Sequence, residues 1–147
     1  MILPMSETVN PLTLSEYSGA ALAYLGDAVM EVLVRKMLVC RGIGNAGKLS
    51  ALSLDYVRAT NQSRGVQGLL PHLTEEETAV YHRGRNAAGA HPKSASVAEY
   101  RRATGLEALF GYLHLQGDIR RTEELFDIYV RCLHSPEGEE DHADEEK

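Results

Sequence analysis

Residues 22–29, LAYLGDAV, lie in a long segment whose apolar residues recur with helical spacing. This segment runs from about Ser15 to Val39 and stops near Gly42 and Gly44, where glycine can end a helix. Apolar side chains occupy nearly every side of its helical wheel. A helix of this kind belongs in the middle of a bundle, so we expect the rest of the chain to pack around it.

The other apolar patterns are helical as well, and no segment alternates with the period of a β-strand. Thr74 and Glu77 have the spacing of a capping box, which marks a helix start, and Gly117 is placed to end a helix. The sequence therefore predicts an all-α fold. Beyond the first segment, we expect helices over residues 46–61, 74–86, 97–103, 106–116 and 118–133, with a loop over 87–96.

Length and charge divide the chain into three parts. Its 147 residues fit one ordinary domain that buries most of its surface. The formal net charge is -6, and residues 137–147 alone carry that value. Because this segment has almost no apolar residues, we expect it to be disordered. We therefore expect an N-terminal extension at 1–13, a single helical domain at 14–134 and an acidic tail at 135–147.

Two features bear on the compartment. The only cysteines, Cys40 and Cys132, do not form the pattern of a disulfide framework. The first ten residues lack a basic region followed by an apolar run, and no stretch approaches the ~20 apolar residues of a membrane span. We therefore expect a cytoplasmic protein with no membrane association.

The neutral body contains one strongly basic stretch, from Arg83 to Arg102, with a local charge of +4. Such a stretch can form a patch that faces phosphate groups. A solvated basic face would have the same composition, and charge alone does not separate the two interpretations.

Asp27 is an acid within the apolar first helix, where an unpaired buried carboxylate is costly. It is expected to be protonated, paired with a cation or bound to a metal. Glu31 and Arg35 follow one and two turns later on the same face. A structural ion-pair network is therefore the alternative to a functional site.

Glu107 is the second unusual acid, in a run that is otherwise nearly free of charge. Thr104 stands three residues before it, which matches a capping box, so Glu107 could serve only to close backbone amides at a helix start. The functional interpretation requires that Glu107 meet Asp27 from another helix. Together they would then offer oxygen ligands suited to Mg²⁺ or Mn²⁺.

The two acidic segments carry a family resemblance. LGDAV at residues 25–29, followed by Glu31, resembles the signature helix of ribonuclease III, and EALFG at 107–111 resembles the second acidic helix of that fold. In full-length ribonuclease III, two further acids stand where this chain has Ala23 and Thr104.

That departure is typical of Mini-III ribonucleases, which have the catalytic domain without a double-stranded-RNA-binding domain. RGRNA at 83–87, Pro92-Lys93 and YRRAT at 100–104 also resemble this group, and the resemblance extends over about residues 15–133.

The resemblance implies a ribonuclease III-like helical bundle that cleaves double-stranded RNA with Mg²⁺ or Mn²⁺ held by Asp27 and Glu107. It implies products with 5′-phosphate and 3′-hydroxyl ends, a homodimer, and precursor large-subunit (23S) ribosomal RNA as the substrate. Side chains cannot read sequence in the narrow major groove of A-form RNA, so recognition rests on shape, 2′-hydroxyls and phosphates. The candidates for RNA binding are Arg83, Arg85, Asn86 and Lys93.

Two other functions remain open at this point. A non-catalytic RNA-binding protein on a ribonuclease III-like fold would account for the missing acids at Ala23 and Thr104. The retention of Asp27 and Glu107 argues against it. A helical adaptor without an RNA role would explain the bundle but not the basic stretch.

Overall fold

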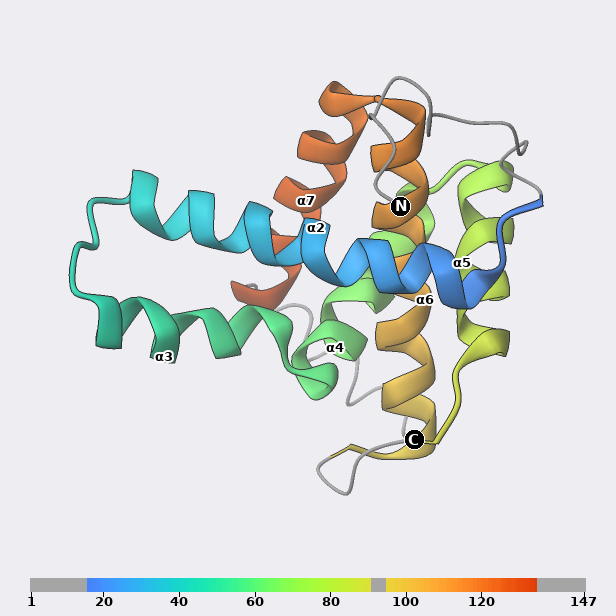
Figure 1. Ribbon diagram of the computed structural model, residues 1–147, viewed down its shortest axis with the longest axis horizontal. Coiled ribbons are helices and arrows are strands. Elements are labelled where there is room, and N and C mark those ends of the chain that lie inside the picture. Colours follow the sequence, from blue (N-terminus) through green and yellow to red (C-terminus); the bar gives the residue numbers. More distant parts are fainter. Residues whose placement is uncertain (1–15, 91–94, 135–147) are drawn as a thin grey trace, which may run out of the picture.

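The computed structural model describes residues 16–90 and 95–134, and all regular structure in these ranges is helical. The predicted extension at 1–13, the acidic tail and Lys93 lie outside the described residues. The elements are α2 (Gly19–Cys40), α3 (Ala46–Val57), α4 (Ala59–Leu69), the short 3-10 helix η2 (Leu70–His72), α5 (Glu75–Ala87), α6 (Val97–Gln116) and α7 (Ile119–His134). Figure 1 shows α2 and α3 as a hairpin that extends from a cluster formed by the other helices. The all-α prediction is confirmed.

The centre of the bundle is α6, whereas the sequence predicted that the first helix would lie there. Helix α6 packs against α2, α5, α4 and α7, and nearly all of its residues from 105 to 113 are buried. Helix α2 lies across α6 and keeps one apolar side exposed, with Tyr24 at 85% and Val32 at 64% exposure. An apolar wheel therefore does not by itself specify full burial within one chain.

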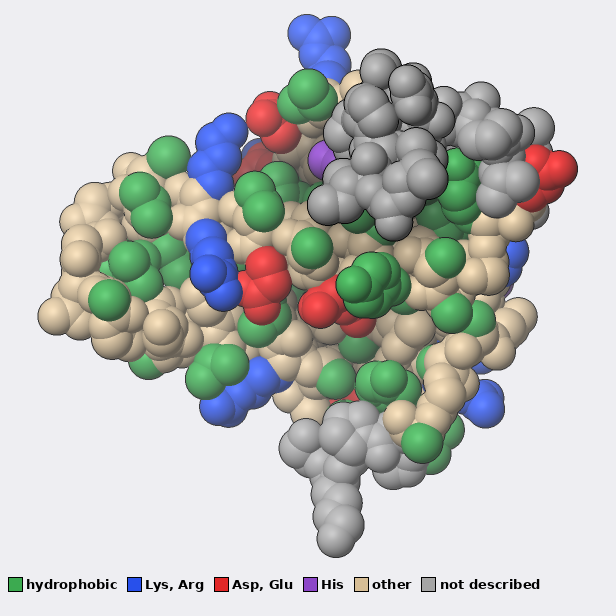
Figure 2. All heavy atoms as spheres, viewed as in Figure 1, with side chains coloured by type: hydrophobic (Ala, Val, Ile, Leu, Met, Phe, Trp, Pro, Cys, Tyr) green, Lys and Arg blue, Asp and Glu red, His purple; other side chains and the backbone are tan. Residues whose placement is uncertain are grey.

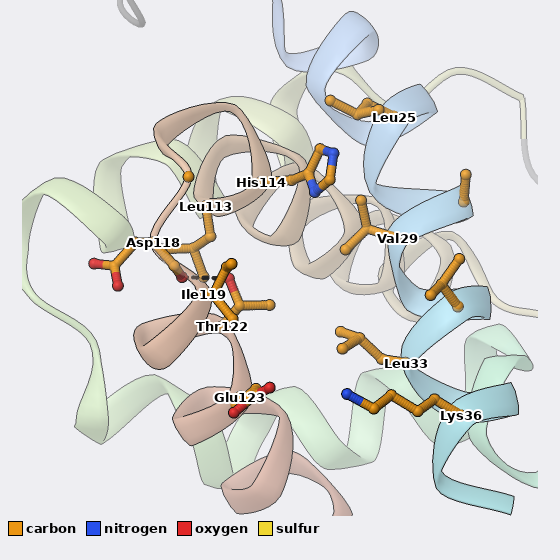
Figure 3. Close-up of a pocket in the computed structure, with 13 residues that line it drawn as sticks. Leu25, Val29, Leu33, Lys36, Leu113, His114, Asp118, Ile119, Thr122 and Glu123 are labelled. Atoms are coloured by element: carbon orange, nitrogen blue, oxygen red, sulfur yellow. Dashed lines mark hydrogen bonds between the residues drawn. The ribbon is translucent and has the colours of Figure 1, made fainter. Parts of the chain in front are cut away.

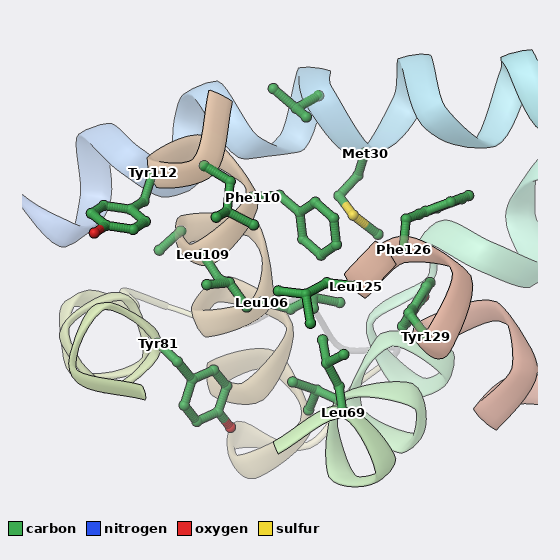
Figure 4. Packing of buried hydrophobic residues seen from close by; sticks show 14 of the residues in the cluster. Met30, Leu69, Tyr81, Leu106, Leu109, Phe110, Tyr112, Leu125, Phe126 and Tyr129 are labelled. Carbon is green, nitrogen blue, oxygen red and sulfur yellow. The ribbon is translucent and has the colours of Figure 1, made fainter. Parts of the chain in front are cut away.

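The core lies where α6 meets α2, α4, α5 and α7. Met30 from α2, Leu69 from α4, Tyr81 from α5 and Tyr129 from α7 surround the buried apolar side of α6 (Figure 4). Each of these side chains is almost fully buried. Burial of a large apolar side chain stabilises the folded state by roughly 1.5–3 kcal/mol. The same burial holds α6 as a rigid support for the side chains on its surface.

The predicted helix over 46–61 is two helices, because the chain becomes extended at Arg58, with ψ at 141°. The second one, α4, was missed because much of its buried surface is not apolar. It buries Gln62, Ser63 and Gly65, and an added Cβ on Gly65 would lie 2.3 Å from the ring of Tyr129 on α7. Polar and small residues carry little hydrophobic periodicity, although close helix contacts often require them.

The predicted capping box at the start of α5 is confirmed. The Thr74 hydroxyl accepts a hydrogen bond from the Glu77 amide at 3.1 Å, and the Glu77 carboxylate accepts one from the Thr74 amide at 2.9 Å. Glu77 also forms a bidentate ion pair with Arg121 of α7, with contacts of 2.9 and 2.8 Å. The hydrogen bonds from Arg121 are the largest cause that lowers the pKa of the buried Glu77. The cap of α5 thus also fixes the position of α7.

The predicted helices 97–103 and 106–116 form one continuous helix, so the break expected near Gly105 is wrong. A Cβ on Gly105 would lie 2.7 Å from the ring of Tyr81, which shows that this glycine serves the packing of α5 on α6. The real capping box of α6 joins Ser96 and Glu99. Gly117 ends the helix with φ at 71°, as predicted.

No helix in the described ranges is long and apolar enough to cross a membrane.

Candidate active site

The site forms where α2 and α6 cross with their backbones in contact. A Cβ on Gly26 would lie 1.6 Å from the backbone oxygen of Glu107, and one on Gly111 would lie 2.0 Å from the backbone oxygen of Leu22. Only glycine permits this approach, which is much closer than an ordinary packed crossing. The residue that follows Gly26 is Asp27, so this crossing brings Asp27 next to Glu107.

The structure brings the two predicted acids together. Asp27 on α2 is exposed, and Glu107 on α6 is half-buried beneath it. Their side chains lie close enough that Asp27 is among the causes that raise the pKa of Glu107. The expectation that Asp27 is buried within the helix packing is wrong, because it points out from the exposed side of α2.

Glu107 lies in a strongly acidic environment. Burial is the largest effect on its pKa, followed by the hydrogen bond and the negative charge of Asp27 and by the charge of Glu31, and together they raise it to about 8. A carboxyl group that retains a proton near neutral pH marks a place where negative charge is in excess. A bound cation would relieve this excess.

The structure also bears on the two structural interpretations, an ion-pair network at Asp27 and a helix cap at Glu107. The ion pair expected on this side of α2 forms between Glu31 and Arg35, at 3.2 Å, while the side chain of Asp27 interacts with that of Glu107. The capping role for Glu107 is wrong, because Thr104 lies inside α6, where its hydroxyl donates to the backbone oxygen of Tyr100 at 2.8 Å.

The two positions where full-length ribonuclease III has further acids contain no acidic oxygen here. Ala23 is buried on α2, one turn before Asp27, and Thr104 is half-buried on α6, one turn before Glu107. Within the described ranges, no three His, Cys, Asp or Glu side chains are grouped so that they could hold a metal ion. The carboxylates of Asp27 and Glu107 are nevertheless a donor pair that fits a hard divalent cation whose other ligands are waters or substrate oxygens.

Three of the four predicted RNA-binding residues lie near the end of α5, and Lys93 lies outside the described residues. Arg85 and Asn86 are exposed in the last turn of α5, whereas Arg83 is half-buried and its backbone oxygen packs against Gly19. Two arginines of the basic stretch that were not chosen as candidates, Arg101 and Arg102, lie beside Arg85 at the start of α6. Their local charge was visible in the sequence, but their position next to α5 depends on the fold.

An apolar groove adjoins the exposed side of α2. Leu113 and Ile119, from the corner between α6 and α7, face Val29 and Leu33 of α2 across a cavity of about 470 Å³ (Figure 3). Ile119 is 72% exposed. On the surface, acidic side chains lie over α2 with hydrophobic side chains beside them (Figure 2).

Comparison with known proteins relates this fold and site to one class. A family profile described as the ribonuclease III domain matches residues 20–118. A Mini-ribonuclease 3 from Desulfitobacterium hafniense (strain Y51) is 44% identical over 133 residues, which cover 90% of this chain and 82% of the relative. A Mini-ribonuclease 3 from Symbiobacterium thermophilum is 49% identical over 117 residues, covering 79% of this chain and 88% of the relative.

A crystal structure of a protein from Fusobacterium nucleatum agrees with this fold, with a TM-score of 0.72 and 32% sequence identity. The match covers 79% of this chain and 93% of that one. The chain belongs to the ribonuclease III family, and its relatives place it in the Mini-ribonuclease 3 branch. It is therefore a ribonuclease III-type endoribonuclease, as the resemblance predicted.

Proposed function

We propose that this protein cleaves double-stranded RNA at Asp27 and Glu107, using a divalent metal ion, Mg²⁺ or Mn²⁺. The observation that carries the proposal is the direct contact of these two acids, one from each helix, at a crossing that only glycine allows. The raised pKa of Glu107 supports it, because a purely structural pair would gain nothing from two adjacent carboxyl groups.

The chain's own residues would hold and orient the reacting groups. Asp27 is exposed and can reach a phosphate at the surface, while Glu107 is fixed from below by the packing of α6. When bound, a divalent cation lowers the pKa of a water ligand and balances phosphate charge, and in-line attack leaves a 5′-phosphate and a 3′-hydroxyl. Because Ala23 and Thr104 contribute no acid, we expect weak metal affinity in the absence of RNA.

The proposed RNA contacts are Arg85 and Asn86, which are exposed, together with Arg83 and Lys93 from the sequence prediction. Contacts with phosphates and 2′-hydroxyls suit a duplex whose base edges are hard to reach. Precursor 23S ribosomal RNA in the cytoplasm is the substrate and compartment that the family resemblance favours.

A homodimer is part of the proposal, with the apolar side of α2 and the adjoining groove as its interface. Tyr24, Val32 and Ile119 are highly exposed apolar residues around this surface, and the site lies beside it. Contact between two copies would bury these residues and place two sites near each other. A duplex has two strands to cut, so a two-fold arrangement matches the substrate.

The test is cleavage of a long RNA duplex by the purified protein with Mg²⁺, with and without a chelator. We expect cleavage that the chelator abolishes, and no cleavage by Asp27→Asn, which retains the side-chain size but loses the anionic ligand. Because Asp27 is exposed, its replacement should leave the thermal unfolding temperature nearly unchanged. A folded Asp27→Asn protein with normal turnover would refute the assignment, and duplex binding without cleavage by the wild type would favour a non-catalytic RNA-binding protein.

A further inference from the structure

Three arginines surround one small cavity where the end of α5 meets the start of α6. Arg85, Arg101 and Arg102 line it together with Val97 and Ala98, and its volume is about 310 Å³. None of the described residues that line it is acidic. The charges of Arg85 and Arg102 both act to lower the pKa of the neighbouring Tyr81, against the larger effect of burial, so both guanidinium groups lie near this side chain.

The local structure keeps these arginines available to a ligand. None of the ion pairs found within the described ranges involves any of the three. Arg102 is held in place by a hydrogen bond from its guanidinium to the Ser63 hydroxyl of α4, at 3.1 Å. The nearest acid in the sequence, Glu99, is turned back to the Ser96 amide at 3.0 Å and does not line the cavity.

Backbone amides add to the positive character of the cavity. The amides of Glu99 and Tyr100 donate to Ser96, at 3.1 and 3.0 Å. The amides of Val97 and Ala98, the first two residues of α6, have no acceptor within the helix, and both residues line the cavity. Guanidinium groups and the free amides of a helix N-terminus both favour a bound phosphate group.

We infer that this arginine pocket anchors a phosphodiester of the RNA duplex away from the bond that is cut. The inference rests on the proposed function, and it adds Arg101 and Arg102 to Arg85 as phosphate contacts. Along α6, Arg101 lies about 9 Å from Glu107, at 1.5 Å per residue, and on a different side of the helix. A phosphate in the pocket therefore cannot be the one at the acidic site. It fixes the position of the duplex instead.

The test is equilibrium binding of a short RNA duplex over a salt series without divalent ions. Arg101→Ala and Arg85→Ala should each weaken binding about fivefold at ~0.1 M salt and reduce the slope of log affinity against log salt by about one. Arg131→Ala is the control, because it removes the same charge from an exposed pair with Asp127 on α7 and should leave the slope unchanged. Thermal unfolding verifies that each variant is folded.

A second arm separates the duplex from free phosphate as the ligand. Inorganic phosphate, titrated at constant ionic strength, should compete with the duplex for the wild type and less for Arg101→Ala. An unchanged salt slope in Arg101→Ala overturns the inference. This holds even if inorganic phosphate no longer binds to that variant. If the wild type cleaves duplex RNA while the slope is unchanged, only the pocket fails. If the wild type neither binds nor cleaves it, the proposed function fails as well.

Discussion

Glu107 is destabilising in its ionised form, because the folded chain places it in a partly buried position beside Asp27 and Glu31. On α7, Tyr129 also faces this group, since the charge of Glu107 contributes to the raised pKa of that buried phenol. The pKa of Glu107 is about 8 in the folded chain and 4.5 ordinarily. As far as Glu107 is concerned, the folded state is therefore more stable below pH 4.5 than at alkaline pH. This stabilisation is lost as the pH rises through 8.

Glu107→Gln should accordingly stabilise the metal-free protein at alkaline pH. We expect the free energy of unfolding at pH 9 to rise by on the order of 2 kcal/mol, with little difference near pH 5. Denaturant unfolding in a chelator at both pH values measures this effect. Asp55→Asn, at an exposed position on α3, is the control and should show no such gain.

The same variant separates two roles of the residue. The wild type should gain stability when Mg²⁺ or Mn²⁺ is added, because binding to the folded state shifts the unfolding equilibrium, whereas Glu107→Gln should gain less. Equal stabilisation of both proteins by the metal ion would remove Glu107 from the proposed ligands.

At the scale of helices, the α2–α6 crossing determines whether the site exists. Gly26 and Gly111 allow backbone contact at the level of Glu107, and the neighbouring core keeps the two helices from separating. If the axes of α2 and α6 were about 8–10 Å apart, as in an ordinary pair of packed helices, the same two acids would lie further from each other. The glycine in the LGDAV segment is thus a positioning residue for Asp27.

Gly26→Ala tests this account. Its Cβ would lie 1.6 Å from the Glu107 backbone oxygen, and backbone atoms cannot yield as a flexible side chain can. We expect a loss of about 3 kcal/mol or more in unfolding free energy, and lower Mn²⁺ affinity in whatever fraction remains folded. Gly44→Ala is the matched control, because an added Cβ meets nothing within 4 Å there. A Gly26→Ala protein with wild-type stability would contradict the close crossing.

The helices show why some of this structure could be predicted from the sequence. Capping residues such as Thr74 and Gly117 act over one turn, so their patterns predicted helix ends correctly. The pattern failed at Gly105 and along α4, where glycine and polar residues serve contacts with α5 and α7 that are distant in sequence. Local patterns cannot distinguish a glycine that ends a helix from one that allows another helix to approach.

For the site, the sequence identified the two acids by resemblance, and the structure adds the contact between them. That contact depends on a crossing of α2 and α6, which are separated by most of the chain. The arginine pocket depends in the same way on the packing of α5 against α6. The composition of the basic stretch was informative, but the choice among its arginines required the fold.

At the scale of the whole molecule, the exposed apolar side of α2 is the feature that a single chain does not explain. This helix has the composition of a central helix, yet Tyr24 and Val32 are exposed. The sequence prediction that it lies in the middle of a bundle becomes correct if a second copy covers that side. The proposed dimer therefore accounts for the composition of α2 as well as for the number of sites that a duplex needs.

Ile119→Glu tests the dimer without disturbing the fold of one chain. Ile119 is 72% exposed at the first turn of α7, where an acidic residue favours the helix dipole, so the monomer should tolerate it. In a dimer, the same change would bury an unpaired charge in an apolar interface, so we expect monomers in analytical ultracentrifugation at concentrations where the wild type is dimeric. Leu54→Glu, at an exposed position on α3, is the control and should remain dimeric. Cleavage of both strands should decline with the dimer fraction, and a dimeric Ile119→Glu protein would show that the groove is not the interface.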